Sequence, residues 1–461
     1  MTTSRDPGAA APPEPDAVWP LSGATEPGPP VGVPAVVAVA DLRATNAAAV
    51  LAAVRSADPY PRLSELAAAT SLSRPTVEAI AEELTDRGLI VVAPAVSARG
   101  RRSPGRPARR FRFRSHAGFV VGVDVRPRSV TACLADLDGE PVAVERRAVR
   151  ADLTGPARAR AVTSLIRSAM DSAEVDVSRV WAATVGTPGL VDRNNTRVRQ
   201  SDNLRTWTEV DIVGILRDHL GCPVAVENDA NLAALGEQWR GVGRAGTGGA
   251  GAAPRRPAPD PATGEMVFVL LGERLGAGVI TGGRLLRGHH GAAGEIGFIH
   301  FPGTTGSDGP GLPPLPATTI REAAMTVGGK EPDPTSGGPV PGMAPSDAVA
   351  AVQSYGRRLA EGLAPVLLAL DPALVVLGTG LFPDAALLPA AETLLTAAQH
   401  HADGLLVDSP RWRLSALGDD AVLTGAVRFA LSSVEVVLRT RPTSLPAARE
   451  TSFHKTHTKL R

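Results

Sequence analysis

Apolar positions near the start of the chain repeat with the spacing of an amphipathic helix. In SLSRPTVEAIAEELTDRGLI, apolar residues from Val77 to Leu84 recur at three- and four-residue intervals, with Ser73 placed to cap the helix and Gly88 to end it. NAAAVLAAVRSA and LSELAAAT, the latter begun by Ser64, repeat the pattern upstream. Three short helices around one small core are typical of a helix-turn-helix.

The residues after Gly88 predict a two-stranded wing. The run LIVV reads as one strand, and FRFR reads as a second with Phe111 and Phe113 on one side and arginines on the other. Thirteen arginines and six acidic residues lie between positions 43 and 114, a balance of +7 in a chain whose net charge is +1. Basic charge is therefore concentrated where a phosphate backbone would lie.

Within this head, residues at the start of the third helix are expected to read base edges in the major groove, and arginines of the wing to contact phosphates. A trihelical unit is also a common protein-interaction fold, and an arginine-rich run can be a solvated linker. We favour DNA because caps, turn, wing and charge agree. The candidate DNA-binding residues are Ser73, Arg74, Thr76, Arg101, Arg102 and Arg106.

The remainder of the chain, residues 117–438, has the alternating pattern of an α/β domain. Strands are expected at 119–125, 129–136 and 141–148, followed by a helix near 157–172, and a similar strand cluster restarts at MVFVLL. A long helix over 346–370 and a final helix over 421–431 come after it. Two lobes built on one plan predict an actin-like architecture with a cleft between them.

Composition adds the segment boundaries. We expect a disordered Pro/Ala-rich tail over residues 1–40, a head over 41–115, a flexible insertion over 241–264 and a loose tail over 439–461. The two isolated cysteines, Cys133 and Cys222, offer neither a disulfide framework nor a thiolate metal site. We predict a cytoplasmic protein without membrane partners, since neither a transmembrane run nor a signal peptide is apparent.

Several motifs together carry a family resemblance. They are GTPGLVD from Gly186, DNLRTW from Asp202, VENDANLAALGE from Val226, LGERLGAGV from Leu271, RGHHGAAGEIGF from Arg287, LDPALVVLGTG from Leu370 and LGDDAVLTGA from Leu417. In this order they resemble the ROK family of repressors and sugar kinases, specifically its regulators. The resemblance implies a winged helix-turn-helix followed by a two-lobed, actin-like or ribonuclease H-like sugar-kinase fold.

The chain departs from the family at the kinase chemistry. Family kinases wrap ATP phosphates with a first loop Asp-x-Gly-Gly-Thr, whereas here Asp124 is followed by Val125, Arg126 and Pro127, so both glycines are lost. The second loop, Gly-Thr-Gly in kinases, reads Gly272, Glu273, Arg274 here, which brings a carboxylate toward bound phosphates. Asp229 matches the position of the catalytic base. We expect no enzyme activity, with Asp229 as a relic.

The family's zinc signature is also missing. Its histidine position holds Phe298, and no cysteine occurs after Cys222. The resemblance otherwise implies a structural zinc, which needs about four N or S ligands. His289, His290 and His300 are nearby, but three histidines without thiolates are more often solvent-facing or core residues. We predict no metal and no cofactor.

Polar residues that match sugar-contacting positions of the family remain. Asn228, Asp229 and Glu295 match positions that hydrogen-bond sugar hydroxyls, and Asn203 lies in a loop that borders the expected pocket. The expected ligand is a sugar or a sugar phosphate. The alternative for Asn228 and Asp229 is a strand-end turn with the aspartate capping a helix over 230–240.

These observations predict a DNA-binding transcriptional regulator, acting as a repressor, that works as a homodimer on a pseudo-palindromic operator of double-stranded DNA. A carbohydrate-like effector in the cleft would change the lobe closure and with it the spacing of the heads. Two alternatives remain open: a hexose kinase that uses ATP and also binds DNA, and a regulator without an effector whose kinase-like body serves dimerisation only.

Overall fold

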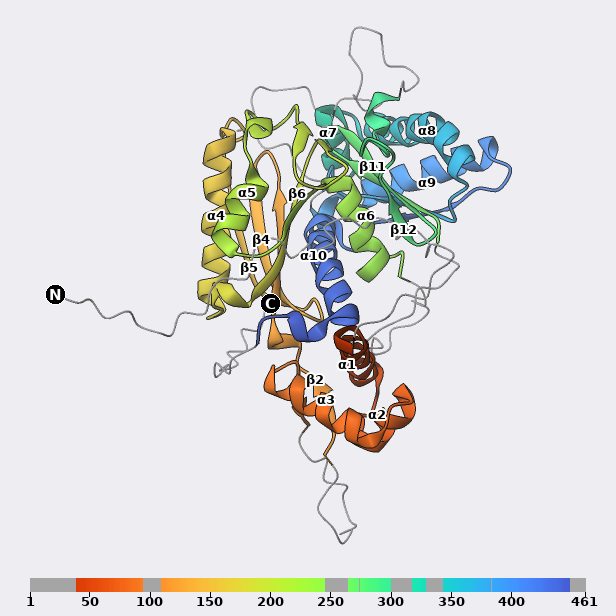
Figure 1. Cartoon of the computed structure of the whole chain (residues 1–461). Coiled ribbons are helices and arrows are strands. Elements are labelled where there is room, and N and C mark those ends of the chain that lie inside the picture. Colours follow the sequence, from red (N-terminus) through yellow and green to blue (C-terminus); the bar gives the residue numbers. More distant parts are fainter. Residues whose placement is uncertain are drawn as a thin grey trace, which may run out of the picture.

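The computed structural model describes residues 39–93, 109–244, 264–272, 274–299, 317–328, 343–382 and 384–447. A small helical head lies at one end of a larger body that consists of two lobes (Figure 1). This arrangement, a helix-turn-helix followed by a two-lobed α/β body, is the predicted fold class. The predicted tail over 1–40, apart from its last two residues, and most of the insertion over 241–264 lie outside the described residues.

The head consists of three helices and a two-stranded sheet, as the sequence pattern predicts. Ser73 caps α3, since its Oγ accepts a hydrogen bond from the Thr76 N–H at 3.3 Å. α2 begins at Leu63, one residue earlier than predicted. Arg62 is its N-cap residue, and the Glu65 carboxylate accepts the N–H of Arg62. The elements are α1 (Val39–Ser56), α2 (Leu63–Thr70), α3 (Arg74–Asp86), β1 (Ile90–Val92) and β2 (Phe111–Phe113).

The first lobe is a five-stranded sheet in the order β5-β4-β3-β6-β9, with α4 and α5 on its outer face (Figure 1). β3 and β4 are buried along almost their whole length, which explains their continuous apolar runs. Its elements are β3 (Phe119–Val125), β4 (Ser129–Asp136), β5 (Pro141–Ala148), α4 (Gly155–Ser172), β6 (Val180–Thr187), α5 (Ile212–Leu220) and β9 (Val224–Asn228); β7 (Leu190–Val191) and β8 (Val198–Gln200) form a small hairpin.

The second lobe repeats this plan, with the strand order β12-β11-β10-β13-β14. In each sheet the first three strands of this order are antiparallel to their neighbours, and the fourth and fifth strands run parallel to the third. The two sheets therefore have the same topology. Its elements are β10 (Met266–Leu271), β11 (Leu275–Thr281), β12 (Arg284–Leu286), α7 (Ala317–Val327), α8 (Pro345–Leu370), β13 (Leu374–Leu377), α9 (Leu388–Leu405) and β14 (Arg411–Leu414).

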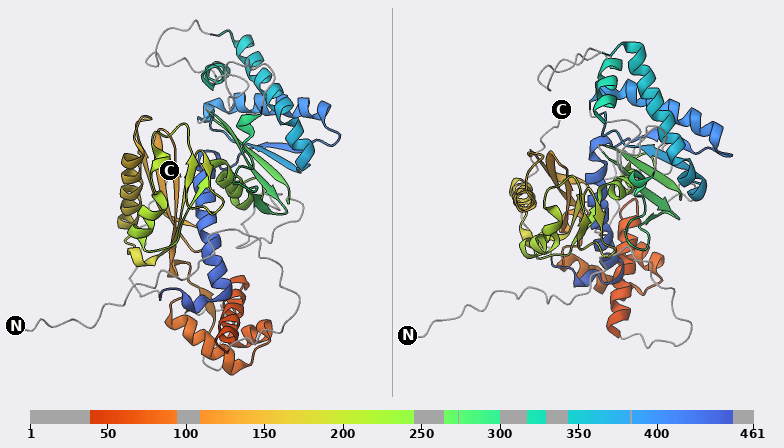
Figure 2. Two further views of the ribbon diagram at one scale, coloured as in Figure 1. Left: turned by 45° about the horizontal axis from the view of Figure 1, so that its top comes forward. Right: turned by 90° about the horizontal axis from the view of Figure 1, so that it is seen from above.

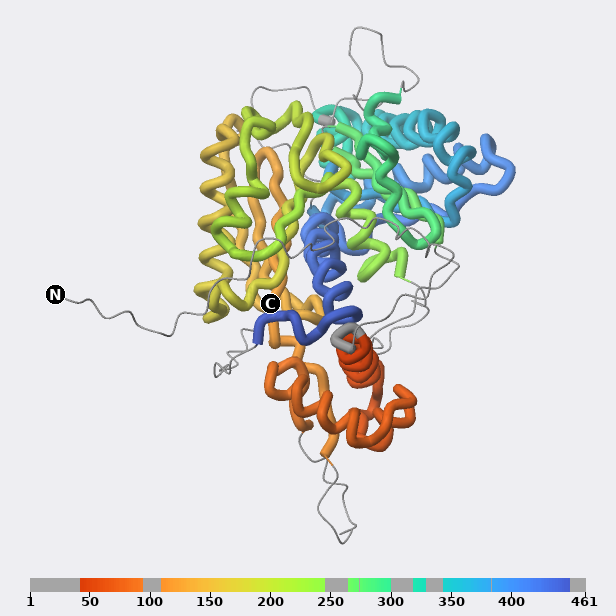
Figure 3. Tube along the Cα trace, viewed as in Figure 1, coloured from red at the N-terminus to blue at the C-terminus, as the bar shows by residue number. Residues whose placement is uncertain are grey.

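Two helices, α6 (Asp229–Arg240) and α10 (Ala421–Thr440), pack against each other between the sheets. Their backbones approach closely: a Cβ on Gly425 would lie 1.8 Å from the Leu232 carbonyl oxygen, and one on Gly236 would lie 2.4 Å from that of Ala421. α6 contacts the second sheet and α10 the first. The Cα trace shows α10 running between the lobes toward the head (Figure 3).

The head shares a hydrophobic cluster with the body. Leu51 and Val54 of α1 belong to the same buried cluster as Leu431, Val434 and Leu438 of α10. A second view shows the head beneath the end of this helix (Figure 2). The head is therefore fixed to the first lobe by packing as well as by the chain connection from β2 to β3.

The end of the chain differs from the sequence expectation. α10 continues to Thr440 rather than ending near position 431, and η8 (Pro442–Ser444) follows it. The predicted loose tail from 439 is therefore ordered as far as residue 447. Leu445 is buried at 2% exposure in the cluster shared with the head, and its carbonyl oxygen accepts a hydrogen bond from Arg87 at 3.5 Å. The head buries the apolar side chains at this end of the chain, and a local sequence pattern does not show that contact.

One helix among the described residues is long and apolar enough to span a membrane. It covers Gly418–Thr440, and an 18-residue stretch of it has a mean hydropathy of 1.7 and is 72% buried within the protein. The expectation that no run reaches this length was wrong, because α10 is apolar around most of its circumference. Burial between two lobes and a head accounts for that composition.

Candidate functional site

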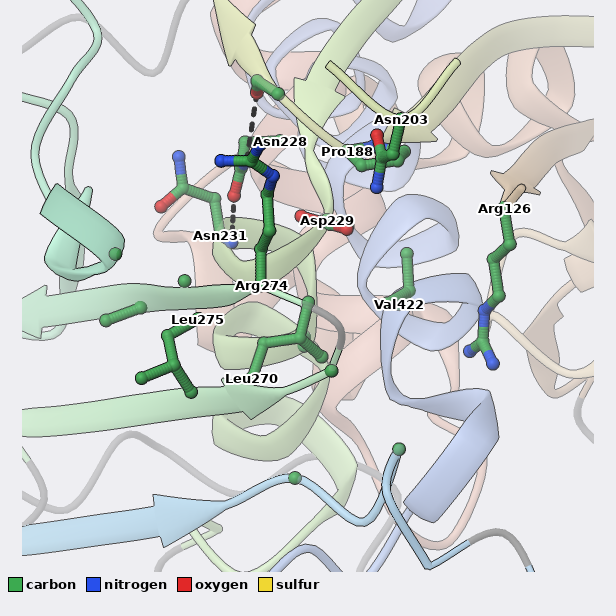
Figure 4. A pocket seen from close by; sticks show the side chains of 18 of the residues that line it. Arg126, Pro188, Asn203, Asn228, Asp229, Asn231, Leu270, Arg274, Leu275 and Val422 are labelled. Atoms are coloured by element: carbon green, nitrogen blue, oxygen red, sulfur yellow. Dashed lines mark hydrogen bonds between the residues drawn. The ribbon is translucent and has the colours of Figure 1, made fainter. Parts of the chain in front are cut away.

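A pocket of about 590 Å³ lies in the cleft between the lobes. The four candidate ligand-binding residues, Asn203, Asn228, Asp229 and Glu295, all line it, although they come from three separate parts of the chain. Figure 4 shows Asn203, Asn228 and Asp229 on one side of the pocket and Arg126 on the other. The sequence-predicted polar residues thus line one pocket.

Asn228 has a structural task in this wall. Its Oδ1 accepts the Asn231 N–H at 3.1 Å and so caps α6, and its Nδ2 donates to the Gly189 carbonyl oxygen at 3.0 Å. The alternative in which the aspartate caps the helix was therefore wrong by one residue: Asn228 is the cap. Asp229 Oδ1 accepts the adjacent Ala230 N–H at 2.9 Å, and among the described residues its other carboxylate oxygen has no hydrogen-bond partner and so can face a ligand.

Three carboxyl groups that line the pocket, those of Asp124, Asp229 and Glu295, have a raised pKa and are shifted toward the neutral form. Burial raises the pKa of Asp229 to about 7, opposed by its hydrogen bond from Ala230. Burial, and then the charge of Asp202, raises the pKa of Glu295. A carboxyl group with a pKa near 7 can both accept and donate hydrogen bonds at neutral pH, which suits recognition of sugar hydroxyls.

The segment that corresponds to the first phosphate loop forms a tight turn. The N–H of Arg126 donates to the Ser129 carbonyl oxygen at 2.8 Å, and Pro127 has no N–H to offer. Behind the turn, the fully buried Arg158 donates to the carbonyl oxygens of Arg126 and Pro127 at 2.6 and 3.1 Å. The backbone donors that would hold a nucleotide phosphate are thus engaged or absent at these two positions.

The Arg126 side chain bridges two carboxylate residues at the opposite wall. Its Nε donates to Asp124 Oδ2 at 2.7 Å, while Nη1 and Nη2 reach the carboxylate and carbonyl oxygens of Asp419 at 3.2 and 2.5 Å. Burial raises the pKa of Asp124, and the neighbouring Arg126 lowers it.

The second loop contributes an ion pair across the cleft. Arg274, at the start of β11, lies 3.4 Å from the Asp202 carboxylate of the first lobe, next to Asn203. Glu273 lies outside the described residues. Gly378, Thr379 and Gly380 line the same pocket.

The residues around the former zinc position do not gather into a metal site in the part that the structure describes. Phe298 lines the pocket and is 54% exposed. The rings of His289 and His290 stack edge to face with their centroids 4.5 Å apart, and His300 lies outside the described residues. No group of three metal-binding side chains occurs among the described residues.

A buried polar network behind the pocket escaped the sequence analysis. Glu227, 2% exposed, accepts hydrogen bonds from Asn195, Asn231 and Arg287 at 2.9, 3.0 and 2.7 Å. Since Arg287 belongs to the second lobe, this carboxylate joins the lobes at the base of the cleft. An acidic residue at the end of the otherwise apolar strand β9 was the signal that could have indicated it.

In the head, the three described candidate residues lie at the start of α3. The hydroxyls of Ser73 and Thr76 lie 2.7 Å apart and bond to each other, so part of their capacity serves the cap. Arg74 is exposed, and its side chain makes no hydrogen bond or ion pair with the described residues. Arg101, Arg102 and Arg106 lie outside the described residues.

Comparison with known proteins matches both parts of the chain. Residues 120–247 match the ROK family, and residues 44–94 match the IclR helix-turn-helix domain. A putative xylose repressor of Caldicellulosiruptor sp. is 24% identical over 50% of this chain and 52% of its own length. A glucokinase of Streptomyces coelicolor is 29% identical over 57% of this chain and 82% of its own length.

Among solved structures, a ROK family transcriptional regulator described as a homologue of the E. coli MLC protein superposes with a TM-score of 0.62 at 19% identity. The match covers 88% of this chain and all of that chain, which supports the same fold. This chain spans about half the length of the xylose repressors that it matches. The chain therefore combines a region similar to the IclR helix-turn-helix domain with a following region similar to the ROK family.

Proposed function

We propose that this protein is a DNA-binding transcriptional repressor whose ROK body binds a small carbohydrate and does not transfer phosphate. The observation that carries the proposal is the combination of an exposed α3 N-terminus in a basic head with a pocket that keeps its polar wall but has lost its phosphate loop. Relatives named xylose repressor support the same assignment.

For the head, the proposal assigns base contacts to Arg74 and neighbouring residues, and phosphate contacts to arginines of the wing. A repressor of this type works in the cytoplasm as a homodimer, with two heads on symmetric half-sites of double-stranded DNA. For the body, it assigns a sugar or sugar phosphate to the wall of Asn203, Asp229 and Glu295. The pocket volume of about 590 Å³ is ample for a monosaccharide.

Selection of bound fragments from the host genome tests the DNA assignment, followed by titration of one enriched fragment with increasing salt. We expect affinity to fall steeply with salt, and Arg74→Ala to lose preference for the enriched sequence over a shuffled one. Glu361→Gln, on the exposed side of α8, is the control that leaves both unchanged. Equal affinity of wild-type protein for enriched and shuffled fragments would contradict the proposal.

Calorimetry with D-xylose, D-glucose and their phosphates tests the carbohydrate assignment. Heat with one ligand that disappears in Asp229→Ala supports the pocket, whereas no heat with any sugar favours an effector-free regulator.

One observation favours a second function, hexose phosphorylation. Asp229 stands at the position of the family's catalytic base, and a glucokinase is among the relatives. A coupled assay with ATP and D-glucose distinguishes the two. We expect no sugar-dependent ADP release, because the Arg126 N–H is already bonded to the Ser129 carbonyl oxygen and Pro127 has no N–H to offer a bound phosphate.

A further inference from the structure

Helix α10 reaches from the pocket to the head. Ala421 and Val422 in its first turn line the pocket, and Leu431, Val434 and Leu438 belong to the cluster that includes α1 of the head. At 1.5 Å per residue its 20 residues span about 30 Å. A single rigid element therefore contacts both the candidate ligand site and the candidate DNA-binding domain.

The pocket end of α10 is held by Arg126. The short turn η7 (Gly418–Asp420) joins β14 of the second lobe to α10, and both the side chain and the carbonyl of its Asp419 accept hydrogen bonds from Arg126. Arg126 also pairs with Asp124, at the end of β3 in the first lobe. We call these three residues the clamp. It attaches the start of α10, which arrives from the second lobe, to the first lobe.

The clamp is anchored from behind. Arg126 sits in the tight turn that closes on Ser129, and the buried Arg158 of α4 holds the carbonyl oxygens of this turn. The guanidinium is thus presented from a fixed backbone, and its three hydrogen bonds need little further ordering. The ion pair of the next residue, Asp420, differs: the Asp420 side chain is 64% exposed and its partner Arg146 is 56% exposed.

The far end of α10 supports the head. α1 packs on α10 and on η8 beyond it, and Arg87, directly after α3, donates to the Leu445 carbonyl oxygen. Near the pocket end, at the fifth residue of α10, the close backbone contact of Gly425 with Leu232 of α6 fixes where the two interlobe helices cross. Both ends of α10 are therefore held, the pocket end by Arg126 and the far end by packing against the head.

We propose that Arg126 is a positioning residue: through Asp419 it fixes the pocket end of α10 and thereby the seat of the DNA-binding head. A ligand that alters the clamp or the closure of the lobes shifts α10 and with it α1. This inference rests on the proposed function for its regulatory meaning, but its structural content does not require DNA or sugar. The replacement of a glycine loop by arginine has, on this view, produced a coupling element.

Hydrogen–deuterium exchange on the full-length protein tests the clamp. In Arg126→Gln we expect amides in the second half of α10 and in residues 46–56 of α1 to exchange at least about fivefold faster, because charge-assisted hydrogen bonds that hold the helix start are lost. Arg146→Gln is the matched control: it removes the ion pair to the next residue, Asp420, and should leave α1 unchanged.

Two outcomes would overturn the proposal. One is faster exchange confined to residues 124–129 and 418–422, and the other is an equal effect of Arg146→Gln on α1. If Arg126→Gln does not fold, Asp419→Asn provides the same test, since it keeps the size and the carbonyl acceptor. Arg126→Lys, which keeps the charge but not the bridging geometry, should restore protection only in part.

DNA binding separates this result from the proposed function. If wild-type protein binds an enriched fragment, Arg126→Gln should change that affinity by at least about fivefold, a coupling of the usual size, while Arg146→Gln does not. If wild-type protein binds no DNA but the exchange pattern is as expected, the repressor assignment fails and the clamp stands. If wild-type protein binds the enriched fragment but the exchange pattern differs from the expected one, the proposed role of Arg126 is refuted and the repressor assignment stands.

Discussion

Replacement of Asp229 by asparagine should stabilise the protein at alkaline pH and leave it unchanged at acid pH. Burial raises the pKa of Asp229 from 3.8 to about 7. A carboxyl group with a higher pKa in the folded state binds its proton more tightly there than in the unfolded chain. The free energy of unfolding therefore falls as pH rises from about 4 to about 7, and asparagine, which has no charge to bury, lacks this loss.

The magnitude follows from the size of the shift. A pKa of about 7 instead of 3.8 corresponds to at most about 4 kcal/mol. Because Asp229 lines an open pocket and is only partly buried, solvent screens part of this cost, and we expect about 2 kcal/mol at pH 8. The amide oxygen of the substituted side chain can still accept the Ala230 N–H, so the helix start is preserved.

Urea unfolding followed by tryptophan fluorescence measures this difference, since Trp207 is buried in the same lobe. The midpoint of Asp229→Asn should exceed that of wild type at pH 8 and equal it at pH 4, while the exposed control Glu361→Gln shifts neither. A constant difference across this range would mean that burial of the charge is not what perturbs the group. A lower midpoint at pH 8 would refute the reasoning outright.

Three further predictions concern the head and the helices between the lobes. Arg74→Ala should cost about 1–3 kcal/mol of discrimination between an enriched and a shuffled DNA fragment, measured by competition binding. Gly425→Ala should lower the thermal midpoint by several degrees, because the new Cβ would meet the Leu232 carbonyl oxygen at 1.8 Å; Gly404→Ala, where nothing lies within 4 Å, should not. Leu51→Ala should destabilise the head by about 2–5 kcal/mol, seen as faster proteolysis of α1 than of α4.

Local patterns predicted most of the elements. Ser73 capped its helix as expected, and the strands at 119–125, 129–136 and 141–148 have the predicted bounds. These predictions succeeded because a helix cap, and a short apolar run bounded by turn residues, depend on a few neighbouring residues. The resemblance to the ROK family, confirmed by the comparisons, supplied the two-lobed arrangement, which no local pattern contains.

The tertiary contacts could not be predicted in this way. Arg126 was recognised as a loss of glycine, but its pairing with Asp419 joins positions almost three hundred residues apart. Likewise, the final helix was predicted to end near position 431, whereas α10 continues beneath the head. The pairing of distant polar residues depends on how the lobes pack against each other, and a single sequence does not show this packing.

The cluster shared by α1 and α10 limits how the protein can be dissected. A fragment that begins at Ala117 would lose α1 and expose Val434 and Leu438 on a helix whose mean hydropathy is 1.7. Such a fragment would self-associate or precipitate. An isolated head cut at the same point would lose the α10 side chains against which α1 packs. Exchange of reading heads between relatives would accordingly succeed only when the last helix is transplanted along with the head.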